Sequence, residues 1–423
     1  MQRSITALCV CFLIALCGCT SGEDTQILRL ANWGGAGGEG EFDLLIQRIY
    51  VEFEAANPGV QIRVENNPEN YTAKMVLSFI AGAEPDIMML DASYAATFIE
   101  NGVLADLSPL IARDPEFRLD DFFQNVTDIA RRGDSLYAIP QDFTPMVLYY
   151  NKKLFDEAGV PYPQSGWSFD DFLQTVKKLT KPGRQYGFVL NNWMPGWVMW
   201  IWNNGGEVLS PEGNKASGYL NGPKSAEAVQ FLADLVNKHK VAPSLSQVAS
   251  LGVDPFLNGQ AAMTVSGHWS MIDYAKAPKG PDGKPTLKWD DLGVVSLPTN
   301  VETSHTVMYE SGFAIGKNCK QKDLAWKFVK FMTSYSVQSR YNASGIAVCA
   351  RKDVAQERGK LPLEAQFLPI VPTARPPLGA LVEGYAFVEP AGQGAMDSVL
   401  QGRRTAEEAL TKAARKVDRN FAK

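Results

Sequence analysis

The apolar and polar positions of the first hundred residues follow two alternating periods. Residues 27–31 alternate as a strand does, and residues 41–56 repeat apolar side chains at the spacing of one helical face. Residues 60–65 predict a second strand and 71–81 a second helix, and residues 86–90 form the continuous apolar run typical of a buried parallel strand. This succession of strands and helices predicts an α/β layer.

Polar and aromatic side chains follow the predicted strands. Trp33 comes after the first strand, Asn66 after the second and Asp91 after the third. Ligands of such sheets bind beyond the carboxyl ends of the strands. We therefore expect Trp33 and Asp91 to face a ligand site.

Residues 139–150 form a long extended segment that contains two prolines and has no helical period. The segment can be one strand of a single sheet or a connector between two lobes, and the pattern leaves both interpretations open. Periodicity then predicts four more helices, at 167–178, 225–238, 322–333 and 405–421, and two more strands, within 258–266 and at 311–316.

The N-terminus has the pattern of an export signal. Its apolar run, residues 5–16, is shorter than the about 20 residues that span a bilayer, but it suits the core of a secretory signal. The run ends in Leu16-Cys17-Gly18-Cys19, which resembles the lipobox of bacterial lipoproteins. The resemblance implies a signal peptide at 1–18, lipid on the Cys19 thiol and a tether at 19–26. An ordinary signal peptide cut nearby is the alternative.

Both interpretations predict an exported protein. The lipobox further implies a lipid anchor that holds it in the cell envelope, in the periplasm or on the outer face of the cytoplasmic membrane. Cys319 and Cys349 are the two cysteines outside the leader. An oxidising compartment permits them to pair, and two buried free thiols are the alternative.

Charge and histidine content argue against several classes. The 423 residues carry a net charge of −5, without the basic excess of a nucleic-acid binder. The three histidines lie far apart and no G-x-S-x-G motif is present. Gly35, Gly37 and Gly40 match the dinucleotide fingerprint, but an exported protein does not meet free nicotinamide dinucleotides. We therefore expect neither an enzyme nor a metal or cofactor site.

Tryptophan is abundant, and four of the nine tryptophans lie within residues 193–202. Trp193, Trp197 and Trp200 have the spacing of one helical face, so core packing accounts for part of the group. Sugar rings stack their C–H faces on indoles, and an acidic, tryptophan-rich exported protein suggests carbohydrate binding. A glycosidase stays open as an alternative, because acids are too common here for the sequence to identify a catalytic pair.

Several motifs resemble one family in the right order. Residues 150–159 (YNKKLFDEAG) resemble its motif YNKxLFxxAG, and 167–172 (WSFDDF) and 262–269 (AMTVSGHW) resemble two others. Segments 311–315, 322–332 and 402–410 match as well. The family comprises the extracellular solute-binding proteins of ATP-binding-cassette (ABC) sugar importers, of the maltose-binding type. The resemblance covers about residues 27–420.

The resemblance implies a two-lobed α/β fold of the periplasmic-binding-protein kind (type II-like), with the ligand in a cleft between the lobes. Three chain crossings are expected, near residues 139–149, 307–311 and 345–350. Lobe one is expected to comprise 27–142 plus 311–345, and lobe two 143–310 plus 346–423.

The resemblance also implies ligand-binding positions. Glu310 departs from the family, in which many relatives have a small residue there, and it can mark a different ligand or form a salt bridge. Arg375 precedes two prolines, so a surface loop is an equal alternative. The expected ligand-binding residues are Trp33, Asp91, Asp142, Trp193, Trp197, Gly267, Trp269, Glu310 and Arg375.

The implied function is capture of a mono- to oligosaccharide by hinge closure and its delivery to the membrane permease of an ABC importer. The expected partners are thus a sugar, the permease and the membrane, with no nucleic acid, and we expect a monomer. A polyol, an amino sugar, an acidic sugar or a glycerol phosphate are alternative ligands, and a sensing role is an alternative function.

Overall fold

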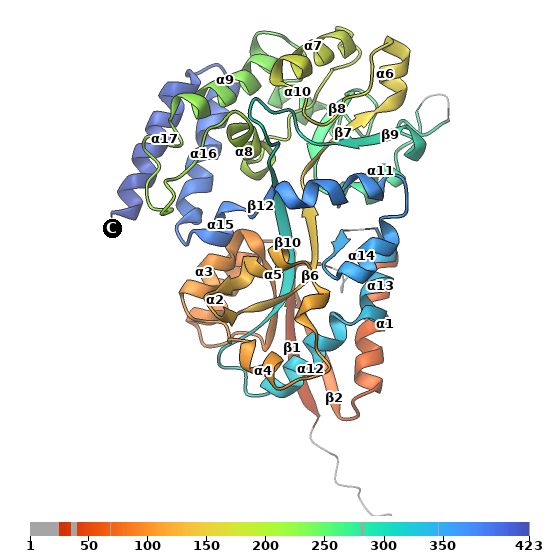
Figure 1. The fold of residues 1–423 in the computed structure, drawn as a ribbon, viewed down its shortest axis with the longest axis vertical. Coiled ribbons are helices and arrows are strands. Elements are labelled where there is room, and N and C mark those ends of the chain that lie inside the picture. Colours follow the sequence, from red (N-terminus) through yellow and green to blue (C-terminus); the bar gives the residue numbers. More distant parts are fainter. Residues whose placement is uncertain (1–24, 35–39, 68, 281–282, 346, 423) are drawn as a thin grey trace, which may run out of the picture.

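The computed structural model describes residues 25–34, 40–67, 69–280, 283–345 and 347–422. The chain builds two bodies, each around its own sheet, one above the other in Figure 1. The predicted signal peptide, Cys19 and the fingerprint glycines Gly35 and Gly37 lie outside the described residues. None of the helices in the described residues is long and apolar enough to cross a membrane.

The lower body in Figure 1 contains the larger sheet, in the order β11-β6-β10-β3-β1-β2, with β12 paired to β10. Strand β1 lies parallel to β2 and β3, whereas β10 runs antiparallel to β3 and β6. The first three predicted strands are confirmed within a residue or two. The strands are β1 (Gln26–Asn32), β2 (Val60–Asn66), β3 (Ile87–Asp91), β6 (Ala138–Pro145), β10 (Thr306–Ile315), β11 (Val348–Cys349) and β12 (Ala374–Arg375).

Helices cover this sheet with the apolar faces that the sequence predicted. Helix α1 buries Ile46, Ile49, Tyr50 and Phe53, and the Phe53 ring meets Phe328 of α12 edge-on at 5.1 Å. Packing of such faces supplies most of the stability of helices in proteins. The helices of this body include α1 (Glu41–Ala55), α2 (Tyr71–Ile80), α3 (Ala95–Glu100), α4 (Ser108–Ala112), α12 (Lys322–Met332) and α13 (Tyr335–Ala343).

The upper body contains a three-stranded sheet, in the order β8-β7-β9, surrounded by helices. Ser168 and Thr405 cap α7 and α17, each in a capping box with an acid three residues on, so both helices begin just after these residues. Its strands are β7 (Val147–Asn151), β8 (Met263–Ser266) and β9 (Leu292–Val295), and its helices include α6 (Lys152–Ala158), α7 (Phe169–Leu179), α8 (Met194–Asn203), α9 (Pro223–Asn237), α10 (Leu245–Leu251), α11 (Ser270–Ala275), α16 (Tyr385–Leu400) and α17 (Ala406–Phe421).

Two long antiparallel strands join the bodies. Strand β6 belongs to the lower sheet and continues through Met146 into β7 of the upper sheet, so residues 139–150 form both a sheet strand and a connector. Strand β10 pairs with β6 along its length, with a shift in register between Ser311 and Gly312. The sequence predicted β10 only from residue 311, but the pairing begins earlier because Met308 already lies opposite Pro145.

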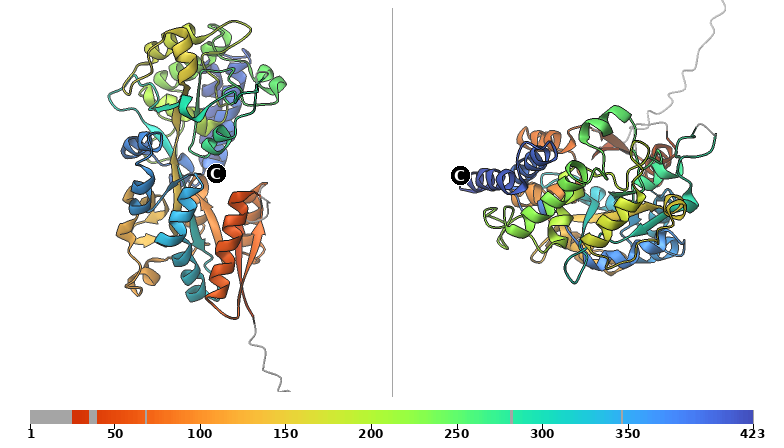
Figure 2. Two further views of the ribbon diagram at one scale, coloured as in Figure 1. Left: turned by 90° about the vertical axis from the view of Figure 1, so that its right-hand side faces the viewer. Right: turned by 90° about the horizontal axis from the view of Figure 1, so that it is seen from above.

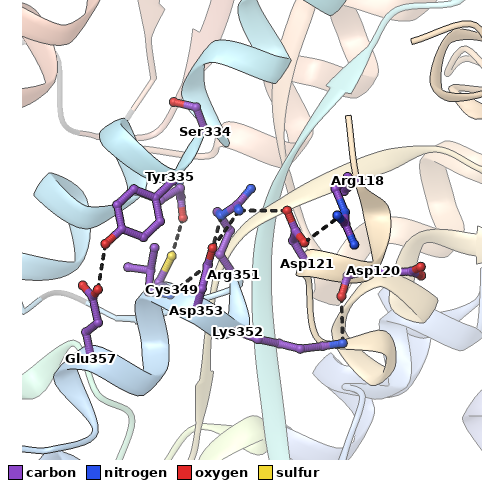
Figure 3. Close-up of polar contacts among 12 residues, drawn as sticks. Arg118, Asp120, Asp121, Ser334, Tyr335, Cys349, Arg351, Lys352, Asp353 and Glu357 are labelled. Carbon is purple, nitrogen blue, oxygen red and sulfur yellow. Dashed lines mark hydrogen bonds and ion pairs between the residues drawn. The ribbon is translucent and has the colours of Figure 1, made fainter. Parts of the chain in front are cut away.

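The chain returns to the lower body before it ends in the upper one. Helix α14 (Lys352–Arg358) follows β11, and α15 (Leu378–Leu381) packs on α3. Figure 3 shows how this return is fastened, with the Arg351 guanidinium 2.9 Å from Asp121 and the Lys352 ammonium donating to the Asp120 carbonyl at 2.9 Å. The part of the chain described from residue 347 to residue 422 therefore contacts both bodies (Figure 1 and Figure 2), and the boundaries given above for the lobes stay a proposal.

Candidate ligand-binding site

A cavity of about 440 Å³ lies where the two bodies meet. Its walls come from the carboxyl ends of β1 and β3, from the joining strands β6 and β10, from α1 and α13, and from the loops before α8 and after β8. Trp33 and Asp91 meet there because β1 and β3 are parallel neighbours. Of the nine expected residues, six line the cavity: Trp33, Asp91, Asp142, Trp193, Trp269 and Glu310.

Three aromatic rings form one wall. Trp193 stands at the N-terminal end of α8, remains 38% exposed and stacks on Tyr309 with centroids 5.6 Å apart and planes at 24°. Trp269 meets the same tyrosine edge-on at 6.1 Å. Glu389 of α16 accepts a hydrogen bond from Trp193, which holds the indole in place. The exposed faces suit a ligand with C–H surfaces.

Gly267 does not line the cavity but controls the position of Trp269. A Cβ atom at residue 267 would lie 2.3 Å from Cζ3 of the Trp269 indole, so the ring occupies the space that a side chain would need. The Gly267 carbonyl accepts a hydrogen bond from Tyr149 at 3.0 Å. The hydrogen bond to its carbonyl thus holds the backbone of Gly267 in place, and the absence of a side chain lets the Trp269 indole pack against it.

The structure places Trp197 and Arg375 away from the cavity. Every residue of α8 is buried, and Trp197 lies in the core with its Nε1 donating to Gln393 at 3.3 Å. Arg375 in β12 pairs with Glu207 at 3.0 Å and lies over the ring of Trp202 at 4.9 Å. Core packing and an ion pair therefore account for these two side chains.

Asp142 and Asp91 are held by donors from the protein. Ser311 Oγ donates to Asp142 Oδ1 at 2.7 Å, Gln141 Nε2 lies 3.2 Å from Oδ2, and the Tyr341 hydroxyl donates to Oδ2 as well. Asp91 caps a short turn by accepting the Ser93 N–H at 2.7 Å. Burial raises the pKa of both carboxyl groups, and these donors oppose that rise.

Glu310 has no such support. Residue 310 borders the cavity, but it is only 3% exposed, and both of its carboxylate oxygens are buried without a hydrogen-bond partner among the described residues. Its strand position, opposite Phe143, is on the other face of β10 from Tyr309 and Ser311. Burial, and then the charges of Asp142 and Asp91, raise its pKa well above the ordinary value. The salt bridge that the sequence left open for Glu310 does not form within the described part of the chain.

The described lining residues include no lysine, arginine or histidine. A ligand with a carboxylate or phosphate would therefore meet the carboxyl groups of Asp91 and Asp142 and no counter-charge, although bidentate arginine is the usual partner of such groups. The electrostatics of the cavity favour neutral or positively charged ligands.

Sequence reasoning missed the aromatic and hydroxyl groups that organise these side chains. Tyr309 is the ring on which Trp193 stacks. It lies within the crossing predicted at 307–311, next to Glu310, so its position in the sequence was a usable signal. Tyr341 comes from α13, far along the chain from Asp142, and no local pattern signals their meeting. The structure also decides between the two interpretations of the cysteines, because Cys319 and Cys349 are both free and buried.

Residues 36–339, most of the chain, match the sequence profile of the bacterial extracellular solute-binding proteins. The chain belongs to this family. Members of the family are binding proteins rather than enzymes. The resemblance seen in the sequence motifs is thereby confirmed at the level of the family.

Individual relatives are distant in sequence and close in fold. This solute-binding protein is 22% identical to a putative binding protein of Brucella abortus (strain 2308) over 88% of each chain. It is 24% identical to the multiple sugar-binding protein of Streptococcus mutans serotype c, over 74% of this chain and 73% of the other. A solved ABC substrate-binding protein, Lmo0181 of Listeria monocytogenes in complex with cycloalternan, superposes with a TM-score of 0.82 at 23% identity, covering 94% of this chain and all of that one. The predicted two-lobed fold is confirmed.

Proposed function

We propose that this protein captures a small polyhydroxylated ligand, a sugar or a polyol, and delivers it to the membrane permease of an ABC importer. The observation that carries the proposal is the composition of the cavity between the bodies. Trp193, Tyr309 and Trp269 offer faces for stacking, while Asp91 and Asp142 offer acceptors for hydroxyl groups. Names of relatives, such as the multiple sugar-binding protein, support the same class of ligand.

The energetics require several of these groups together. A micromolar complex needs about 8 kcal/mol, whereas one neutral hydrogen bond contributes about 0.5–1.5 kcal/mol net. Trp193 and Trp269 belong to the upper body, Tyr309 lies on the joining strand β10, and the ends of β1 and β3 belong to the lower body. Movement of the bodies about β6 and β10 would bring both sets of contacts onto one ligand, and the closed form would then be the one that docks on the permease.

The sequence also bears on where the protein is located and on which alternative ligands and functions remain. A lipid on Cys19 would hold the protein in the cell envelope, where the permease is. The absence of a cationic side chain among the described lining residues weighs against the acidic sugar and the glycerol phosphate. We propose no catalytic step, because the family consists of binding proteins.

A thermal-shift screen of the full-length protein tests the proposal. The panel contains mono-, di- and oligosaccharides, polyols, amino sugars and glycerol phosphates. A ligand at about 100 times its Kd stabilises the folded state by about 2.7 kcal/mol, which raises Tm by a degree or more. We expect one class to raise Tm in the wild type and in Trp289→Ala, but not in Trp269→Ala. Trp289 is 41% exposed and lies outside the cavity, so it is a matched control. No shift across the panel would contradict the proposal.

A further inference from the structure

The cavity between the bodies extends past the polar ends of the strands. Side chains alternate between the two faces of a sheet, and Tyr309, Ser311 and Phe313 of β10 share the face that lines the cavity. Ser311 is paired with Asp91 of β3. Phe313 is paired with Met89, and both of these apolar residues line the cavity as well. The lining therefore changes from polar to apolar within two residues of strand, a distance of about 7 Å.

Helix α1 forms the wall opposite these apolar residues. Phe42, Ile46 and Tyr50 follow one another at intervals of four residues, so they share one face of the helix, and all three line the cavity. Phe42 is partly buried, and its ring meets that of Tyr341 of α13 edge-on at 5.6 Å. The part of the cavity between α1 and the sheet is the apolar recess, lined by Phe42, Ile46, Tyr50, Met89 and Phe313.

Polar side chains of the cavity are already bonded to protein partners. Thr144 Oγ1 accepts the N–H of His268 at 2.6 Å. Asp142 accepts three hydrogen bonds, from Ser311, Gln141 and Tyr341. A carboxylate has about four acceptor sites, so Asp142 keeps room for one ligand hydroxyl. Apolar contact therefore has to supply a large part of the affinity that these polar groups do not.

The volume of the cavity exceeds what a single ring requires. An apolar cavity of about 150 Å³ binds benzene, whereas this cavity measures about 440 Å³. Transfer of apolar surface from water into such a space is favourable. Aromatic rings prefer to meet edge-on, as Phe42 and Tyr341 do, so the recess favours a further aromatic ring.

We infer that the ligand is a sugar that carries an apolar group of about the size of a benzene ring, so that the substrate class is an aryl glycoside; this inference rests on the proposed function. The aryl group enters the apolar recess. The hydroxyl groups of the sugar bind at Asp91 and Asp142, and its ring stacks on the aromatic wall of Trp193 and Trp269.

Matched glycosides test the inference on the wild-type, full-length protein. Phenyl and methyl glycosides of glucose, galactose and mannose, each as both anomers, are compared with the free sugars by isothermal titration calorimetry. We expect at least one phenyl glycoside to bind about tenfold or more tightly than its methyl partner and the free sugar. It should also bind with a more negative heat-capacity change, which is the marker of buried apolar surface.

Variants then assign the preference to the recess. Ile46→Phe fills the recess from α1, so the preference for the phenyl glycoside should fall below about threefold. Phe42→Ala removes a wall of the recess at a partly buried position and should have the same effect, which keeps the test usable should Ile46→Phe fail to fold. Phe387→Ala is the control, since Phe387 is 49% exposed and outside the cavity lining, and it should keep the preference.

A further variant separates the recess from the aromatic wall. Trp269→Ala should weaken the phenyl and the methyl glycoside alike, because both stack their sugar ring on this indole. Loss of the preference in Trp269→Ala alone would show that the phenyl group binds to the aromatic wall, and it would overturn the assignment to the recess.

The remaining outcomes separate the inference from the proposed function. Phenyl and methyl glycosides that bind with equal affinity, for every sugar of the panel, would overturn the inference and leave the proposed function intact. A preference that persists in both Ile46→Phe and Phe42→Ala would overturn the role of the recess. If no sugar, polyol or glycoside binds, both proposals are contradicted.

Discussion

His268 and Glu364 join two distant parts of the chain, with Nε2 of the imidazole 2.6 Å from Oε2 of the carboxylate and both residues buried. The other carboxylate oxygen, Oε1, accepts from Arg358 Nε at 2.6 Å, and Arg358 donates to the carbonyl of Asn342 at 2.8 Å. The backbone N–H of His268 in turn donates to Thr144 of β6 at 2.6 Å. This buried relay, a chain of hydrogen bonds from Thr144 through His268, Glu364 and Arg358 to Asn342, connects the motif before Trp269 to the C-terminal end of α13.

Replacement of Glu364 by glutamine should lower the free energy of unfolding by about 1–3 kcal/mol at neutral pH, because it removes the charged acceptor of a buried relay. Glu157→Gln, which removes an exposed partner of Lys153 and Lys181, should cost less than about 1 kcal/mol. Chemical denaturation of both variants measures the difference. Equal stability of the two variants would show that the relay does not stabilise the fold.

The same carboxyl group predicts a pH dependence. Burial by itself would raise its pKa, but the hydrogen bonds and charges of His268 and Arg358 outweigh burial and hold the pKa of Glu364 below its ordinary value of 4.5. Its stabilising contribution is therefore fully present above pH 4.5 and is lost as the pH falls through the folded-state pKa. The wild type and Glu364→Gln should converge in stability on acidification, and a constant difference would contradict this assignment.

Glu310 predicts the opposite dependence for the ligand-free protein. Its folded-state pKa is raised, mainly by burial, so the folded state binds the proton more tightly than the unfolded state and stability falls as the pH rises above 4.5. Glu310→Gln should be more stable than the wild type by about 1–3 kcal/mol at about pH 8 and close to it at about pH 5. Melting curves across this range measure the effect. A variant that is less stable at about pH 8 would show that Glu310 has a partner in the free protein.

Gly267→Ala should weaken ligand binding about tenfold or more although residue 267 does not line the cavity. The added methyl group would occupy the space of the Trp269 ring and displace the indole from the stacking wall. Trp269→Ala should have a similar or larger effect, as expected for an aromatic group at the centre of a site. Calorimetry with the ligand found in the screen compares the two variants with Trp289→Ala. Full affinity in Gly267→Ala would mean that the ligand does not need the indole where it now lies.

The two cysteines of the described chain should resist alkylation while the protein is folded. Burial raises the pKa of the Cys319 and Cys349 thiols to about 12, so little reactive thiolate is present at neutral pH. Cys349 additionally lies 2.5 Å from the side-chain oxygen of Gln338. Mass spectrometry of the peptides after iodoacetamide treatment, with and without denaturant, measures this protection. Rapid labelling of Cys349 in the folded protein would contradict it.

Local patterns were enough for the elements that lie early in the sheet and for the groups at their ends. Strands β1, β2 and β3 follow from periodicity, and Trp33 and Asp91 follow from the rule that ligands bind at the carboxyl ends of parallel strands. Trp193 and Trp269 lie on the cavity as expected. The spacing of the tryptophans and the family motif were enough to predict these two positions without knowledge of any tertiary contact.

Other features depend on contacts that periodicity does not encode. The spacing of Trp197 fits a helical face, but α8 is buried on every side, so the pattern could not tell a cleft tryptophan from a core one. Arg375 meets Glu207 across a large separation in sequence. Glu310 stood out as a departure from the family, yet its lack of a partner depends on the positions of Asp91, Asp142 and Gly312 in space.

The strands that join the bodies are also the floor of the cavity. Asp142 on β6 and Tyr309 and Ser311 on β10 line the cavity next to the point where the register of the pair shifts, so residues that face the proposed ligand lie on the strands about which the bodies would move. A substitution there alters the stiffness of the ribbon together with its chemistry. A change of ligand preference at these positions should therefore also alter how readily the two bodies move apart.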